Sequence, residues 1–117
     1  MINEIRAAIV FLCTCAQNGT KKQILYDFEQ KKYYHYNLLK DSFQYYLYDY
    51  ERDSYLQGNL SQIYDIKTHS YILLKLEKNK FIGFERNSGS YIYGNINNNL
   101  IIVFDTQKNK YIQYTAF

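Results

Sequence analysis

One short pattern occurs five times in this chain of 117 residues, and it constrains the fold more than any other feature. Each copy has an aromatic residue, then an acidic residue, then five further residues, and then a tyrosine. The acidic residues of successive copies are 22, 16, 20 and 20 positions apart. The copies are Tyr26-Asp27…Tyr33, Tyr48-Asp49…Tyr55, Tyr64-Asp65…Tyr71, Phe84-Glu85…Tyr91 and Phe104-Asp105…Tyr111. A repeat of this kind predicts one structural unit that is used five times.

The repeated unit has the features of a β-hairpin. Apolar and polar residues alternate before each acid and after each tyrosine, which is the period of a half-buried strand. The acidic side chain at the head of the loop can accept hydrogen bonds from the amides of its own turn. Four positions after the acid, such a turn needs a left-handed backbone, which Gly, Asn, Asp and His tolerate best. The residues at this position are Lys31, Asp53, His69, Gly89 and Asn109.

Ten strands fit the pattern, and the links between hairpins are too short for a helical crossover. Neighbouring strands must therefore be antiparallel. The sequence predicts an all-β fold, a ten-stranded up-and-down meander of five hairpins with one N-terminal helix. The expected strands are residues 23–28, 32–38, 43–50, 54–60, 61–66, 70–76, 80–85, 90–96, 100–105 and 110–116.

The two faces of this meander follow from the register, for which we place each acid opposite the tyrosine of its own hairpin. A slip of one residue would exchange the faces. The inner face then carries Tyr34, Tyr36, Leu38, Leu56, Gly58, Leu60, Ile72, Leu74, Leu76, Ile92, Gly94, Ile96, Ile112, Tyr114 and Ala116, and from the partner strands Ile24, Tyr26, Tyr46, Tyr48, Tyr64, Ile82, Phe84, Ile102 and Phe104. The outer face carries Tyr33, His35, Asn37, Tyr55, Gln57, Asn59, Tyr71, Leu73, Lys75, Tyr91, Tyr93, Asn95, Tyr111, Gln113 and Thr115.

A ten-stranded meander with one apolar face must close or fold over to bury that face. We expect a barrel or flattened clam, or a two-layer sandwich. Gly58 and Gly94 occupy equivalent inward positions, where a missing side chain permits sharp coiling or makes room for a plug. A propeller fragment is an alternative, because kelch-type blades contain similar hairpins. Each blade needs four strands, however, and ten strands would make two and a half.

Residues 1–17 differ from the rest of the chain and allow two interpretations. Ile2, Ile5, Ile9, Leu12 and Ala16 form one stripe of an amphipathic helix, which would be the natural plug or lid of the barrel. As a secretory signal, the same segment would be cleaved after Ala16. We favour a retained helix and a cytoplasmic location over secretion. Residues 18–117 then form a single β domain, whose strands begin after the break at Asn18-Gly19-Thr20.

Composition and motifs point away from several classes of function. The net charge is +3, and the basic residues are scattered singly, so no nucleic-acid partner is expected. The apolar run before Cys13 is too short to span a membrane. Cys13 and Cys15 are the two cysteines, and neither a disulfide nor a zinc site is expected of them. The five acids recur because the hairpin recurs, so we expect no catalytic residues, cofactor or metal, and no enzyme.

Two binding functions remain. In the first, the tyrosine-rich outer face recognises a protein, as an inhibitor, an immunity-type neutraliser or an adaptor would. Tyrosine offers large, rigid contact area, and Asn and His add adaptable hydrogen bonds. In the alternative, the barrel interior carries an apolar or aromatic small molecule. The candidate partner-binding residues are Tyr33, His35, Tyr55, Tyr91, Tyr93 and Asn95.

Overall fold

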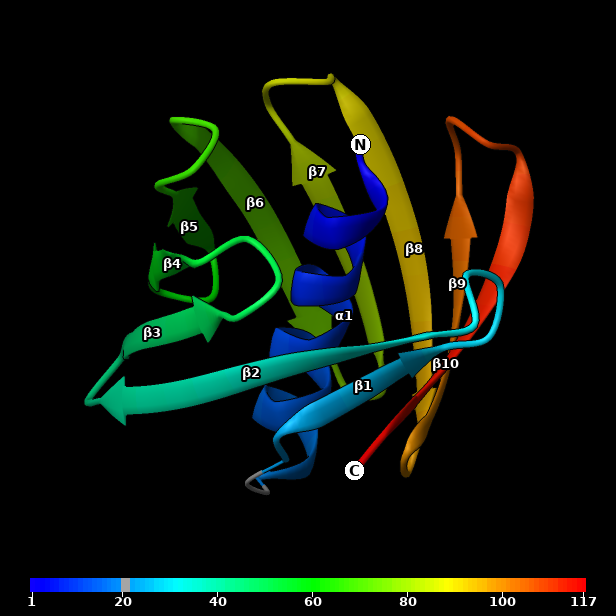
Figure 1. Ribbon diagram of the computed structural model, residues 1–117, viewed down its shortest axis with the longest axis horizontal. Coiled ribbons are helices and arrows are strands. Elements are labelled where there is room, and N and C mark those ends of the chain that lie inside the picture. The colour runs from blue at the N-terminus through cyan, green and yellow to red at the C-terminus, as the bar shows by residue number, and fades with distance from the viewer. Residues whose placement is uncertain (20–21) are drawn as a thin grey trace.

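The computed structural model describes residues 1–19 and 22–117, and it shows a β-barrel with a helix inside (Figure 1). The helix α1 spans Asn3–Asn18. All ten predicted strands form, within three residues of their expected ends. They are β1 (Ile24–Asp27), β2 (Lys32–Asp41), β3 (Gln44–Asp49), β4 (Ser54–Gly58), β5 (Gln62–Asp65), β6 (Ser70–Glu77), β7 (Lys80–Glu85), β8 (Ser90–Asn97), β9 (Leu100–Asp105) and β10 (Lys110–Ala116).

The strands follow one another around the barrel in chain order, and β1 pairs with β10 to close the sheet. All pairs are antiparallel, so the predicted up-and-down meander is confirmed. The closing pair places Leu25 opposite Ala116. Of the closed, layered and propeller arrangements that the sequence allowed, the chain adopts the closed barrel, which pairs the outer strands of the meander with each other.

The turns of the five hairpins share the predicted backbone conformation, and three of them show the predicted capping by the acid. The backbone is left-handed at the expected position in every copy, with φ of 53° at Lys31 and 54° at His69. The carboxylate of Asp27 accepts hydrogen bonds from the backbone N–H groups of Glu29 and Gln30, at 2.9 and 3.0 Å. The same two bonds recur in the turns headed by Asp49 and Asp105. In these three turns the acid holds the loop from within.

The register within each hairpin differs by one residue from the expected one. The residue opposite the tyrosine is the aromatic residue before the acid, as in the pairs Tyr26–Tyr33 and Phe84–Tyr91. The acid pairs instead with the residue before the tyrosine, for example Glu85 with Ser90. This one-residue shift turns the acids into the barrel and the aromatic residues outward.

The predicted inner face is therefore right for one strand of each hairpin and wrong for the other. On β2, β4, β6, β8 and β10 the expected residues point inward. On the partner strands the core is made by Leu25, Leu47, Ile63, Phe81 and Val103. The residues wrongly assigned to the interior are half-buried or exposed on the outer face, and they are Ile24, Tyr26, Tyr46, Tyr48, Tyr64, Ile82, Phe84, Ile102 and Phe104.

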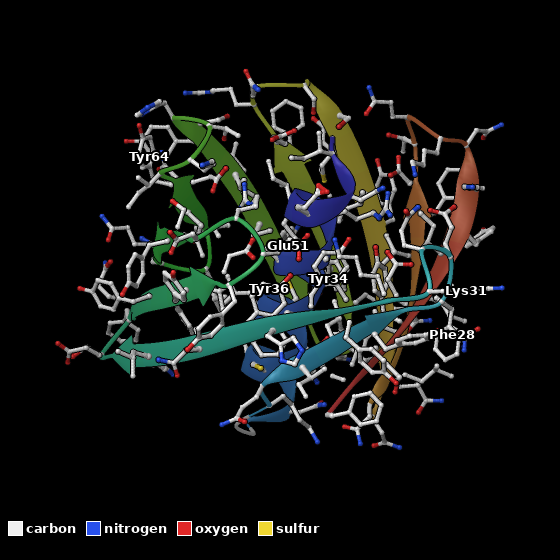
Figure 2. The ribbon with its side chains drawn as sticks, viewed as in Figure 1. Phe28, Lys31, Tyr34, Tyr36, Glu51 and Tyr64 are labelled. Atoms are coloured by element: carbon white, nitrogen blue, oxygen red, sulfur yellow. The ribbon has the colours of Figure 1, made fainter. Side chains whose placement is uncertain are left out.

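The helix α1 occupies the interior, with the strands arranged around it (Figure 1). Every residue from Ile5 to Cys15 is buried, so the buried surface extends around the whole helix and is wider than the predicted stripe. Tyr34 and Tyr36 on β2 point toward the helix (Figure 2), and the ring of Tyr36 stacks on Phe11 at 4.5 Å. The plug thus completes the core of the barrel.

Gly19 caps the C-terminal end of the helix: it has a φ of 63° and donates its backbone N–H to the Cys15 carbonyl at 2.9 Å. Thr20, the last residue of the predicted break, lies outside the described residues. Among residues 1–19 and 22–117, no helix has the length and apolar character needed to cross a membrane.

Candidate protein-recognition surface

The candidate partner-binding residues all lie on the outer wall of the barrel, and all are exposed. In this respect the predicted outer face is confirmed. They come from three strands: Tyr33 and His35 from β2, Tyr55 from β4, and Tyr91, Tyr93 and Asn95 from β8.

The structure does not bring these six residues into one surface. In the barrel order, β8 is four strands away from β2 in one direction and four strands away from β4 in the other. Tyr33 instead packs against Tyr26, with ring centroids 4.6 Å apart, and Tyr55 packs against Tyr48 at 4.9 Å. The candidates therefore divide into a β8 group and a β2–β4 group, which one flat partner surface could not cover together.

The β8 group belongs to rows of side chains that cross several strands. Tyr93 is paired on one side with Ile82 of β7 and on the other with Phe104 of β9. Phe104 is in turn paired with Tyr111 of β10, and their rings are 5.0 Å apart. Neighbouring strands are about 4.8 Å apart, so these four side chains form a continuous row across the barrel wall.

A second row lies beside the first. Phe84 of β7 is paired with Leu73 of β6 and with Tyr91 of β8, and the rings of Phe84 and Tyr91 are 4.5 Å apart. The two rows meet where Tyr91 and Tyr93 stack at 6.3 Å with nearly parallel rings. We call this surface the aromatic face, and its residues are Leu73, Ile82, Phe84, Tyr91, Tyr93, Ile102, Phe104 and Tyr111.

Half of the aromatic face could not be found with the expected register. Ile82, Phe84, Ile102 and Phe104 were assigned to the core, yet they line this outer surface. The signal that places them outside is the acid beside them. If the acid of each repeat turns inward to hold its turn, the preceding aromatic residue must point outward, because side chains alternate along a strand.

The burial of the acids also changes the charge of the surface. Residues 67–117, which the structure describes in full, contain seven basic residues and three acidic ones. Glu85 and Asp105 are buried, which leaves Glu77 as the one exposed acidic side chain of this half. The basic side chains are all exposed, and they are Lys67, Lys75, Lys78, Lys80, Arg86, Lys108 and Lys110. The strands that carry the aromatic face are thus surrounded mainly by positive charge.

Two of these basic residues have a partner from the turn between β1 and β2. Lys108 and Lys110 both pair with Glu29, the first at 3.3 Å. Partial burial opposes the ionisation of Glu29, but hydrogen bonds from Lys110, Gln30 and Lys108 outweigh it and lower the pKa of Glu29 to about 2. The remaining five make no ion pair with a residue that the structure describes.

The buried acids form two ion clusters inside the barrel. Arg6 of α1 donates a 2.9 Å hydrogen bond to Asp105, and its guanidinium lies 3.6 Å from Asp27. Arg52 bonds both Asp49, at 2.8 Å, and Asp65, at 2.9 Å. These contacts give four of the five repeat acids a buried ionic role. The turn-capping role inferred from their recurrence is confirmed for three of the five, because backbone N–H groups of the turn bond to Asp27, Asp49 and Asp105.

Burial and the neighbouring side chains together shift the pKa values of groups around the plug. Burial works against the charge of Arg6, but Tyr114 and Asp105 outweigh it, so the pKa of Arg6 is raised. Burial raises the pKa of Cys13 and of Cys15, which keeps both thiols neutral. The interior that was the alternative place for a small ligand is occupied by α1 and these side chains.

Comparison with protein-family profiles, with curated proteins and with solved structures finds no match to this chain. The function must therefore be argued from the chemistry of its own surfaces.

Proposed function

We propose that this protein is a non-enzymatic binding protein that recognises a protein partner through its aromatic face. The observation that carries the proposal is the pair of cross-strand rows on β6–β10, which place Tyr91 and Tyr93 among five further exposed or half-buried apolar and aromatic side chains. Contiguous apolar side chains on an outer surface mark interaction sites more often than single ones do.

The make-up of the aromatic face suits a protein better than a nucleic acid. Leu73, Ile82 and Ile102 lie among the rings, and branched aliphatic side chains gain most from packing against a dry protein surface. Tyrosine adds contact area with little loss of conformational entropy and keeps a hydroxyl for hydrogen bonding. Asn95, paired with Ile102 at the edge of the rows, supplies an amide at the rim.

The charge around the aromatic face supports a partner with an acidic rim. Lys75 is paired with Ile82 at the end of one row, and Lys80 is paired with Asn95. Both are exposed, and positive charge around an apolar centre steers a negatively charged partner and speeds association. The filled interior gives further support, because it leaves the outer wall as the surface on which recognition can take place.

The test compares variants from the two groups of candidates. Immobilised wild-type protein, Tyr93→Ala and Tyr55→Ala are incubated with an extract of the native host, and bound proteins are quantified by mass spectrometry. The partner enriched by the wild type is then purified and its Kd measured for each variant. We expect Tyr93→Ala to weaken binding by about 2 kcal/mol, as central interface aromatics do, and Tyr55→Ala to bind normally.

Two further measurements complete the experiment. The melting temperatures of both variants should stay close to that of the wild type, because each tyrosine is exposed. Raising the salt concentration should slow association if the lysines steer the partner. A lower melting temperature for Tyr93→Ala with unchanged affinity would show that the rows only shield the sheet, and a loss confined to Tyr55→Ala would move the site to the β2–β4 group.

A further inference from the structure

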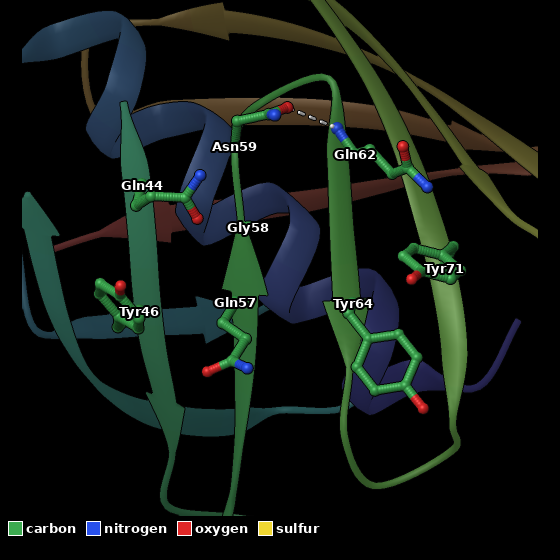
Figure 3. Close-up of a pocket in the computed structure, with 8 residues that line it drawn as sticks. All are labelled: Gln44, Tyr46, Gln57, Gly58, Asn59, Gln62, Tyr64 and Tyr71. Atoms are coloured by element: carbon green, nitrogen blue, oxygen red, sulfur yellow. Dashed lines mark hydrogen bonds between the residues drawn. The ribbon is translucent and has the colours of Figure 1, made fainter. Parts of the chain in front are cut away.

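A shallow groove of about 460 Å³ crosses the outer wall over β3–β6 (Figure 3), and its lining contains no residue of the aromatic face. Its floor is a row of four side chains in register. Tyr46 is paired with Gln57, Gln57 with Tyr64, and Tyr64 with Tyr71. Three steps of about 4.8 Å make this row roughly 14 Å long. The volume is within the range of small-ligand sites, about 300–1,000 Å³.

The groove owes its shape to the short pairing of β4 with β5. These strands pair over three residues and are joined by a tight turn at Asn59. Gly58 has a φ of 146°, and a Cβ on it would lie 2.4 Å from the carbonyl oxygen of Gln62. Oδ1 of Asn59 accepts the backbone N–H groups of Ser61 and Gln62, at 2.9 and 3.0 Å. The backbone is thereby fixed in place before any ligand arrives.

Three more amides stand along the rim above the row. Gln44 begins β3, Asn59 is in the turn after β4 and Gln62 begins β5, and Figure 3 shows their side chains beside those of the row. The hydrogen bond drawn there joins the Gln62 backbone to Asn59, so the side-chain amides of Gln44, Gln57 and Gln62 make no bond to another residue in the view. Each amide offers two N–H donors and one oxygen acceptor.

Two of the three tyrosines of the groove make side-chain contacts that hold them. The Tyr64 hydroxyl lies 3.2 Å from Nδ1 of His69, and the rings of Tyr64 and Tyr71 meet edge to face at 5.0 Å. Tyr46 and Tyr71 are more than a third exposed, so their rings offer apolar surface beside the free amides. The lining thus combines ring surface with amides and hydroxyls, and it contains no charged residue.

We propose that this groove binds a neutral saccharide, either free or as a glycan on a larger molecule. A phosphate, carboxylate or ammonium group would find no counter-ion among the lining residues. An apolar ligand would leave the amides without partners. The hydroxyls of a sugar can both donate to and accept from side-chain amides, and the C–H face of a sugar ring packs against tyrosine. The groove adjoins the aromatic face where Gln62 is paired with Leu73, but the four residues of its row lie outside that face, so the proposal stands or falls independently of the proposed function.

The probes are maltotriose, cellotriose and chitotriose at millimolar concentrations, titrated into the full chain and followed by two-dimensional amide NMR. At least one trisaccharide should shift the backbone resonances of β3–β6 and leave those of β8–β10 in place. Gln57→Ala and Tyr71→Ala should each weaken binding about tenfold or more. Gln113→Ala and Tyr111→Ala are the matched controls, because they remove the same residue types from β10, and they should bind as the wild type does.

Failure of all three trisaccharides to shift β3–β6 would overturn the proposal. So would binding that the groove variants and the β10 variants weaken equally. A short uncharged peptide titrated in parallel is the competing occupant, and a peptide that binds the groove more tightly than any of the sugars would also overturn it. If Tyr93→Ala loses binding of the protein partner but keeps binding of the sugar, both proposed sites are supported.

Discussion

Nη1 of Arg6 on the central helix donates a hydrogen bond of 2.9 Å to Oδ2 of Asp105 at the end of β9, and both residues are fully buried. The same guanidinium lies 3.6 Å from Asp27 at the end of β1. Asp27 and Asp105 are the acids of the first and last hairpins, which become neighbours only because β1 pairs with β10. One arginine therefore joins the plug to both sides of the closing seam.

Replacing Arg6 by Met should lower the free energy of unfolding by about 3–5 kcal/mol, because removing one partner leaves buried carboxylates without their counter-charge. Urea denaturation followed by circular dichroism measures the change. Glu4→Gln is the control, since Glu4 is on the same helix, is half-buried and lies outside this ion cluster. Glu4→Gln should cost less than about 0.5 kcal/mol. Equal stability of Arg6→Met and wild type would show that the cluster does not hold the plug.

Two phenylalanines on β7 allow a direct test of which face is inside. Phe81 points into the barrel and is 2% exposed, whereas Phe84 lies on the aromatic face. Phe81→Ala should destabilise the protein by about 3–5 kcal/mol through the cavity that it leaves. Phe84→Ala should cost only about 0.2–1 kcal/mol, the value of its cross-strand contact with Tyr91. The same chemical change on one strand thus has two very different expected costs, and a larger loss for Phe84→Ala would contradict the register.

The hairpin repeat made most of the fold predictable, because its information is local. Five agreeing turns gave the strand positions, and the left-handed conformation at residues such as Lys31 and Asn109 follows from turn chemistry alone. The register was less determined by the sequence. In most repeats two apolar or aromatic residues in a row precede the acid, as Leu25-Tyr26 precede Asp27, so either face of the strand could have been the buried one. Placing Asp27 inside requires a buried counter-charge, which Arg6 supplies. Arg6 is 21 positions away, in a segment that the sequence allowed to be either an amphipathic helix or a signal, so this pairing could not be predicted.

The candidate site shows the same limit at longer range. Exposure of Tyr55 and Tyr93 followed from strand alternation, but their separation around the barrel depends on closure of the sheet. The positive charge around the aromatic face could not be predicted either, because the acidic residues that balance the basic ones in the sequence are buried in the structure. The net charge counted from the sequence does not distinguish an acidic residue inside the barrel from one on its surface.

Gly94 on β8 is covered by the ring of Phe81, and this contact gives a further prediction. A Cβ added at Gly94 would lie 2.0 Å from Cζ of Phe81, so Gly94→Ala forces the ring to move. Overpacking of this kind typically costs about 1–3 kcal/mol, which thermal unfolding would measure. Adding Phe81→Leu should recover part of the loss, since it removes the atoms that clash. If the stability lost by the double variant equals the sum of the losses of the two single variants, the glycine is required for a reason other than the clash with Phe81.

Glu29 gives a prediction about pH. Its folded-state pKa is lowered from 4.5 to about 2, chiefly by hydrogen bonds from Lys110, Gln30 and Lys108, which outweigh the opposing effect of burial. A carboxylate with a depressed pKa contributes stability above its unfolded pKa and loses it as the pH falls through its folded pKa. The contribution is therefore complete above about pH 5 and disappears between about pH 4.5 and pH 2.

Glu29→Gln should accordingly be less stable than the wild type at pH 7, by about 1 kcal/mol because the lysine partners are largely exposed and screened. The difference between the two proteins should shrink through the acid range and vanish near pH 2, although both lose stability there as buried carboxylates protonate. Urea denaturation of both proteins at a series of pH values measures the difference directly. Glu77→Gln, which removes an exposed acid with no ion pair to a described residue, should show no such trend. A difference for Glu29→Gln that persists unchanged at pH 2 would mean that Glu29 acts through packing and not through its charge.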